Sequence, residues 1–88
     1  MDRIADPGRA LRLARAILSD VMLYNADKVR AGIEADDLFE RLREELAEAR
    51  TFFEERVEPD VAVRTNAFGR AVVDVLIYRS RAVRSRIW

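Results

Sequence analysis

Three polar side chains, Asp20, Tyr24 and Asp74, stand inside otherwise apolar stretches and are the first candidates for chemistry. A carboxylate there must stay solvated or find a partner, so each aspartate is a recognition or catalytic acid or half of an ion pair. We favour pairing: Asp20 with an arginine of the last predicted helix, and Asp74 with Arg70 one turn away. The chain has no His and no Cys, which removes the commonest general base, the best nucleophile and the usual zinc ligands.

A second group of candidates is a set of glutamates in the middle of the chain: Glu44, Glu45, Glu48, Glu54, Glu55 and Glu58. Paired carboxylates can bind a metal or transfer protons. Di-metal sites in helical bundles, however, combine Glu with a His three residues later, and this chain has no His. We interpret the glutamates as a solvated acidic face. We therefore expect no catalytic residue, no cofactor site and no metal site, and we predict that the chain is not an enzyme.

Four arginines, Arg79, Arg81, Arg84 and Arg86, lie close together before the C-terminal Trp88. They could contact nucleic-acid phosphate, an anionic membrane surface, or acidic residues of this chain or of a partner protein. We favour a contact with acidic residues of this chain or of a partner protein, because phosphate binding normally needs a broader positive field than a chain of zero net charge supplies. Nucleic acid stays open as the alternative.

Charge is sorted along the sequence. Residues 32–60 carry 11 acidic and four basic side chains, whereas residues 61–88 carry six arginines and a single acid. An acidic middle segment can therefore meet basic flanks, either within one chain or between two. Fifteen of the 16 basic residues are arginine, which indicates a GC-rich bacterial genome more than a special function.

Length and composition predict one small domain. A chain of 88 residues buries a small fraction of its surface, so its stability is marginal. The chain has no cysteine for disulfides and no visible metal-ligand cluster, so oligomerisation is the remaining way to enlarge the hydrophobic core. Half of the residues are apolar, so the chain is not disordered. There is no uncharged apolar run long enough to span a membrane and no secretory signal pattern after Met1. We expect a cytoplasmic protein.

The apolar residues recur at helical spacing in three segments. The first helix is expected at 7–31, with Asp6 as its cap, Pro7 in its first turn and Gly32 as its stop.

The second helix is expected at 36–57 and ends before Pro59. A linker or short helical turn follows, and Thr65 or Asn66 caps a third helix at 66–86. The sequence thus predicts an all-α fold, a three-helix bundle completed by homo-oligomerisation.

The first and third predicted helices carry more apolar surface than one bundle needs, which is typical of an interface. We expect a homodimer, with a second protein as another possible partner. The favoured function is a non-catalytic interaction or oligomerisation module with a regulatory or scaffolding role, and the alternative is a small nucleic-acid-binding regulator. The expected core or interface anchors are Leu18, Met22, Val75, Leu76 and Ile77.

Residues 14–29 resemble the "ARxLxSDxxLYNxxKV"-like helix of a family of poorly characterised small helical domains in bacteria. Further matching pieces are Asp37-Leu38, Arg41-Leu42, Glu55–Val57 and Arg64–Asn66, so the resemblance covers roughly residues 10–78. In such proteins the helical unit tends to be a C-terminal appendage to other modules, sometimes zinc ribbons or signalling domains, which implies a docking or oligomerising role in regulation. The family has no assigned activity, so the resemblance implies no catalytic residues. This chain departs from the pattern in its arginine-rich end.

Overall fold

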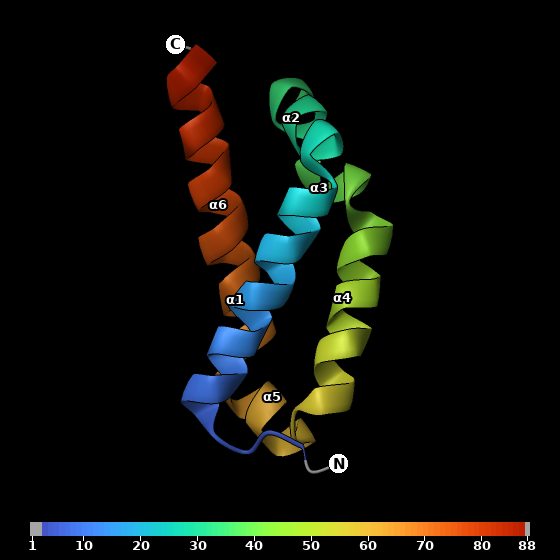
Figure 1. Ribbon diagram of the computed structural model, residues 1–88, viewed down its shortest axis with the longest axis vertical. Helices are drawn as coiled ribbons and strands as arrows, with labels where there is room; N and C mark the ends of the chain where they lie inside the picture. Colours follow the sequence, from blue (N-terminus) through green and yellow to red (C-terminus); the bar gives the residue numbers. More distant parts are fainter. Residues whose placement is uncertain (1–2, 88) are drawn as a thin grey trace.

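The computed structural model describes the backbone of residues 3–87 and the side chains of residues 3–78 and 81. These residues form α-helices and no β-strand, so the predicted all-α class is confirmed (Figure 1). The helices in chain order are α1 (Pro7–Tyr24), α2 (Ala26–Ala35), α3 (Leu38–Arg41), α4 (Arg43–Arg56), α5 (Pro59–Thr65) and α6 (Ala67–Ile87).

The first helix begins where the sequence predicts, but it is interrupted. The side chain of Asp6 accepts a hydrogen bond from the backbone N–H of Arg9 at 2.9 Å, and Pro7 occupies the first turn. At Asn25 the backbone leaves the helical region, and the Asn25 side-chain amide donates to the Val21 carbonyl at 2.8 Å. An amide that bonds the backbone in this way competes with helix continuation. The helical path therefore divides into α1 and α2.

Gly32, the expected stop, lies within α2, and the helix continues to Ala35. Asp36 then adopts the left-handed conformation, with φ 60°. The backbone N–H of Asp37 donates to the Gly32 carbonyl at 2.9 Å, and that of Asp36 donates to the Ile33 carbonyl at 3.3 Å. These two bonds form a Schellman ending. The glycine serves close packing instead, because a Cβ on Gly32 would lie 2.8 Å from the Leu38 Cα atom.

The middle of the chain is also divided further than the sequence indicates. Instead of one helix over 36–57, the short α3 and the longer α4 meet at Leu42, whose side chain is fully buried. Residues 58–64, expected as a linker or a short helical turn, largely form the helix α5, which is capped at its end by Asn66 in the left-handed conformation. The Thr65 hydroxyl accepts a hydrogen bond from the Ala67 N–H at 3.2 Å at the start of α6.

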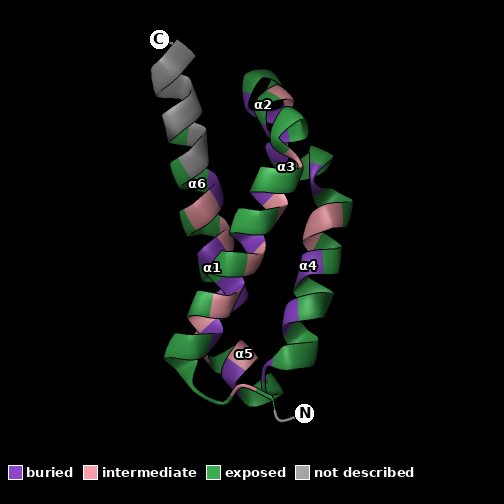
Figure 2. Cartoon of the chain, viewed as in Figure 1, coloured by how far each residue is buried: buried purple, intermediate pink, exposed green. Residues whose placement is uncertain are grey.

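Helix α1 lies between α4 and α6 and packs against both, in an arrangement that measures 44 × 21 × 18 Å (Figure 1). Buried residues occupy the facing sides of these helices (Figure 2). Small side chains let α1 and α6 approach closely, since the buried residues there include Ala10, Ala14, Ala67 and Ala71.

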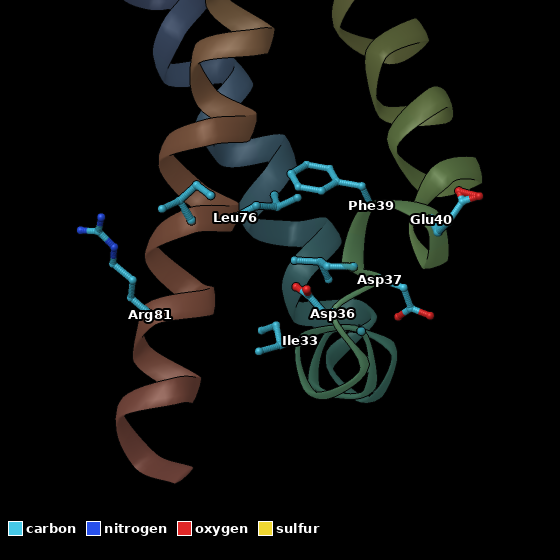
Figure 3. A pocket seen from close by; sticks show the side chains of 10 residues that line it. Ile33, Asp36, Asp37, Phe39, Glu40, Leu76 and Arg81 are labelled. Carbon is cyan, nitrogen blue, oxygen red and sulfur yellow. The ribbon is translucent and has the colours of Figure 1, made fainter. Parts of the chain in front are cut away.

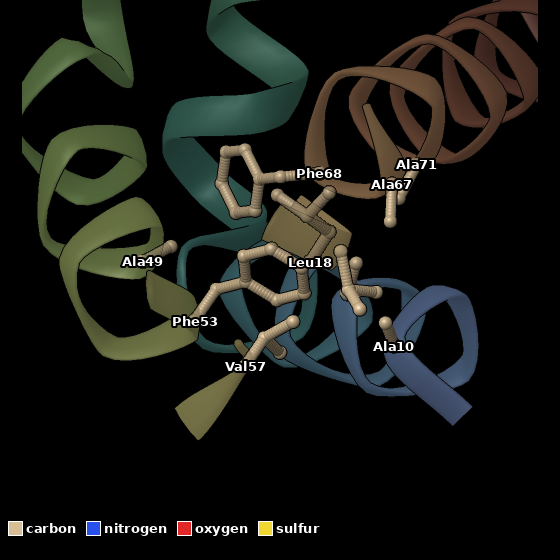
Figure 4. Packing of buried hydrophobic residues seen from close by; sticks show 10 residues of the cluster. Ala10, Leu18, Ala49, Phe53, Val57, Ala67, Phe68 and Ala71 are labelled. Atoms are coloured by element: carbon tan, nitrogen blue, oxygen red, sulfur yellow. The ribbon is translucent and has the colours of Figure 1, made fainter. Parts of the chain in front are cut away.

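The first cluster of the core surrounds two aromatic rings, those of Phe53 and Phe68 (Figure 4). The rings of Phe53 and Phe68 lie 5.7 Å apart between centroids and are tilted by 43°, which is a favourable aromatic geometry. Leu18 and Val57 are buried in the same cluster. A second cluster continues the core toward α2 and α3 and contains Met22, Val29, Ile33, Leu38, Leu42 and Leu76.

Candidate interaction surface

Of the three polar residues singled out first in the sequence, Asp20 and Tyr24 lie together beside α4, whereas Asp74 lies elsewhere, on α6. Asp20 and Tyr24 lie exposed on α1, and Tyr24 is 82% exposed. Asp74 pairs with Arg15 of α1 at 2.9 Å, not with Arg70, so the pair joins α6 to α1. Within the described residues Asp20 has no ion pair, so the expected partner on the last helix is not found there.

The glutamates of α4 form an exposed face, apart from Glu45. The Lys28 ammonium group donates a hydrogen bond to Glu45 Oε1 and links α2 to α4. This bond lowers the pKa of the Glu45 carboxyl below its ordinary value and raises the pKa of Lys28. The other oxygen, Oε2, is shielded from solvent and has no hydrogen-bond partner among the described residues. In the described part of the chain, no group of three or more carboxylates is placed to hold a metal ion.

A groove of about 540 Å³ opens between α6 and the α2–α3 corner, and we call it the α6 groove (Figure 3). Its floor contains Ile33, Leu38 and Leu76, all buried in the chain's own core. Its edges carry two exposed apolar side chains, Phe39 on α3 at 52% and Ile77 on α6 at 42%. In Figure 3 the Phe39 ring points toward α6, beside Leu76.

The polar rim of the α6 groove differs between its two edges. On the α3 side, Asp37 pairs with Arg41 and Glu40 pairs with Arg43, each at 2.6 Å. On the α6 side, Arg81 points away from α2 and α3 and has no ion pair with a described residue (Figure 3). The acidic edge is therefore largely neutralised within the chain, whereas no described carboxylate neutralises the guanidinium group of Arg81.

The residues expected at the interface separate into two groups in the structure. Leu18, Met22 and Leu76 are buried within this chain, at 0–3% exposure, and Val75 is half-buried against the same core. Ile77 is the one that remains exposed, on the edge of the α6 groove. Of the four arginines near the C-terminus, Arg81 has a described side chain. The side chains of Arg79, Arg84 and Arg86 lie outside the described residues.

A second groove, of about 340 Å³, lies between α1 and α4, and we call it the α1–α4 groove. Ile17, Val21 and Ala49 form its apolar part, and Tyr24 and Phe52 stand beside it. Asp20 and Tyr24, the first candidates in the sequence, also line this groove, but the sequence pattern does not predict that α4 lies beside them. The available signal was Phe52, a large apolar residue that does not follow the apolar seam of its helix.

Comparison of the chain with models of known protein families, with curated proteins and with solved structures finds no match. Among the described helices, none combines the length and the apolar character that crossing a membrane requires. Function is therefore inferred from the two grooves and their charges.

Proposed function

We propose that this chain is a non-catalytic protein-interaction module that associates with a second copy of itself through the α6 groove. The observation that supports this proposal is the pair of exposed apolar side chains, Phe39 and Ile77, on opposite edges of a groove whose floor is apolar. An exposed apolar surface beside a groove is typical of an interface. In a homodimer, the α6 face of each copy would cover the groove of the other.

The α6 helix supplies the complementary surface for such a contact. Val73 is 57% exposed and lies one helical turn before Ile77, so both side chains project from the same face. A helix of a second copy packed on this face would cover the apolar surface that the chain leaves exposed, which is the completion by homo-oligomerisation that the sequence predicts. The small size of the chain also favours association, because oligomerisation adds buried apolar surface that 88 residues cannot supply alone.

Arg81 would set the orientation of the two copies. Its guanidinium group has no ion pair with a described residue, and the acids of residues 32–60 give the second copy an excess of carboxylates. A charge at the rim of an interface contributes more to orientation and association rate than to affinity. The module would act in regulation or scaffolding in a bacterial cytoplasm, the role implied by the resemblance of residues 14–29 to poorly characterised small helical domains of bacteria.

The test is the mass in solution, measured by light scattering after size exclusion over a wide concentration range. The wild type should show twice the 10.2 kDa chain mass. Ile77→Asp should shift the protein to the single-chain mass at unchanged helical circular dichroism, because a carboxylate would be buried against the partner. The matched control is Val63→Asp, at a valine on α5 that is 82% exposed and lies at the opposite end of the molecule from the groove (Figure 1). A wild type of single-chain mass at all concentrations would overturn self-association.

A small nucleic-acid-binding regulator is the second candidate, and the guanidinium group of Arg81, which has no ion pair with a described residue, favours it. It ranks lower because the chain has no net positive charge to attract phosphate. Titration with duplex DNA at low and high salt separates the two functions. Salt-sensitive binding that Arg81→Glu weakens would support the nucleic-acid function, and absence of binding at low salt would exclude it.

A further inference from the structure

The α1–α4 groove carries negative charge that is only partly neutralised by described residues. Asp20, Glu45 and Glu48 line it, and no Lys or Arg does. Glu45 is paired with Lys28, but Asp20 and Glu48 have no ion pair with any described residue. The exposed carboxylates of Asp20 and Glu48 stand beside an apolar floor. This combination favours a ligand that presents positively charged groups next to apolar groups.

The aromatic walls of this groove differ in how firmly they are held. The guanidinium group of Arg56 lies over the Phe52 ring, 3.3 Å from its centroid, so one face of the ring is covered by a cation. Tyr24 is 82% exposed and stands at the end of α1, next to the break at Asn25. Phe52 therefore provides a supported wall, whereas the Tyr24 ring is free to lie on an incoming side chain.

We infer that the α1–α4 groove binds an amphipathic helix of a partner protein that carries Lys or Arg beside its apolar anchor residues. Both walls of the groove are helices, whose backbone groups are already hydrogen-bonded, so a partner strand would find no free edge. A helix can insert apolar side chains at i, i+3 and i+4 between Ile17, Val21 and Ala49. Its flanking cations would then reach the carboxylates of Asp20 and Glu48. Nucleic acid and anionic membranes are disfavoured here, because like charges repel.

This inference concerns a different face from the proposed self-association. The residues that line the α1–α4 groove are not shared with the α6 groove. The two ideas can therefore fail separately: a protein that never dimerises can still bind a basic helix, and a dimer can lack this binding.

The experiment uses two labelled peptides of about 15 residues, long enough to form an amphipathic helix. One has leucines at i, i+3, i+4 and i+7 on a lysine background, and the other has the same leucines on a glutamate background. Fluorescence anisotropy of each peptide is measured with the full chain at low and at high salt. The lysine peptide should bind, and its affinity should fall as the salt concentration rises. The glutamate peptide should not bind.

Charge reversal within α4 provides the matched variants. Glu48→Lys should weaken binding of the lysine peptide by about tenfold, which corresponds to about 1.4 kcal/mol. Glu54→Lys is the control, because Glu54 is exposed on the same helix and does not line this groove. Helical circular dichroism checks that both variants are folded.

Methyl resonances then locate the peptide. Those of Ile17 and Val21 should shift on binding, while those of Ile33 and Ile77 in the α6 groove should stay in place. Equal binding of both peptides, an unchanged affinity in Glu48→Lys, or shifts confined to the α6 groove would each overturn the inference.

Discussion

Replacing Gly32 by alanine tests whether close packing, not helix termination, accounts for this glycine. Gly32 lies inside α2 with negative φ, so alanine is compatible with the backbone conformation. In an isolated helix the substitution would stabilise by about 1 kcal/mol, because alanine has the higher helix propensity. In the folded chain the added Cβ would lie 2.8 Å from the Leu38 Cα atom and 3.2 Å from Leu38 Cδ1.

The packing effect should outweigh the propensity effect. The nearest atom is backbone, so relief requires α2 and α3 to move apart, and overpacking of this kind costs about 3 kcal/mol at the upper end of its usual range. After subtraction of the propensity gain, Gly32→Ala should lower the free energy of unfolding by about 2 kcal/mol. For a domain of this size, that loss lowers the melting temperature by about 10 °C.

The assay is urea unfolding followed by circular dichroism, with Gly8→Ala as the control. A Cβ on Gly8, which is exposed, would have one close neighbour, the Asp6 Oδ2 atom at 3.3 Å. That variant should therefore be as stable as the wild type or more stable. A Gly32→Ala protein that matched or exceeded the wild-type free energy of unfolding would refute the packing explanation.

Three further predictions follow from the core, a helix cap and an ion pair. Phe53→Ala should lower the free energy of unfolding by about 3–5 kcal/mol, because Phe53 is buried in the core. Phe52 is exposed, so Phe52→Ala should cost about 1 kcal/mol or less, the scale of its cation–π contact. Equal losses of stability for the two variants in thermal melts would contradict the burial of Phe53. Asp6→Ala should cost about 1 kcal/mol in urea unfolding, and Asp6→Ser should recover most of it. Because the folded-state pKa of Glu45 is lowered, its stabilisation is present above the ordinary glutamate pKa and is lost as pH falls through the lowered value. Lys28→Met should return the Glu45 pKa, followed by NMR, toward its ordinary value, and an unchanged pKa would exclude the pair.

Local signals in the sequence predicted the helical class and the ends with unambiguous chemistry. Asp6 and Pro7 start α1 as expected, since a cap and a proline act within one turn. The breaks at Asn25 and Leu42 were not predicted. Leu42 continues an apolar helical pattern, and its burial at the α3–α4 junction depends on contacts with distant residues that periodicity does not contain.

The candidate surfaces were harder to predict than the fold. The helical spacing of apolar residues does not reveal which of these residues the chain itself covers. Leu18 and Leu76 are fully buried, whereas Ile77, the residue after Leu76, is exposed. Likewise, Arg70 lies one helical turn from Asp74 and is a possible ion-pair partner by sequence spacing. The packing of α1 against α6 instead places Arg15 beside Asp74, and these two residues form the ion pair. Such choices depend on how the helices meet in space.

The most direct test of self-association through the α6 groove is an isotope-filtered NOE measurement on an equal mixture of labelled and unlabelled protein. This experiment detects contacts between copies only. Cross-peaks between the Phe39 ring of one copy and the Ile77 or Val73 methyl groups of the other are the predicted result. A dimer whose intermolecular cross-peaks arise from other residues, or a mixture with none at high concentration, would contradict it.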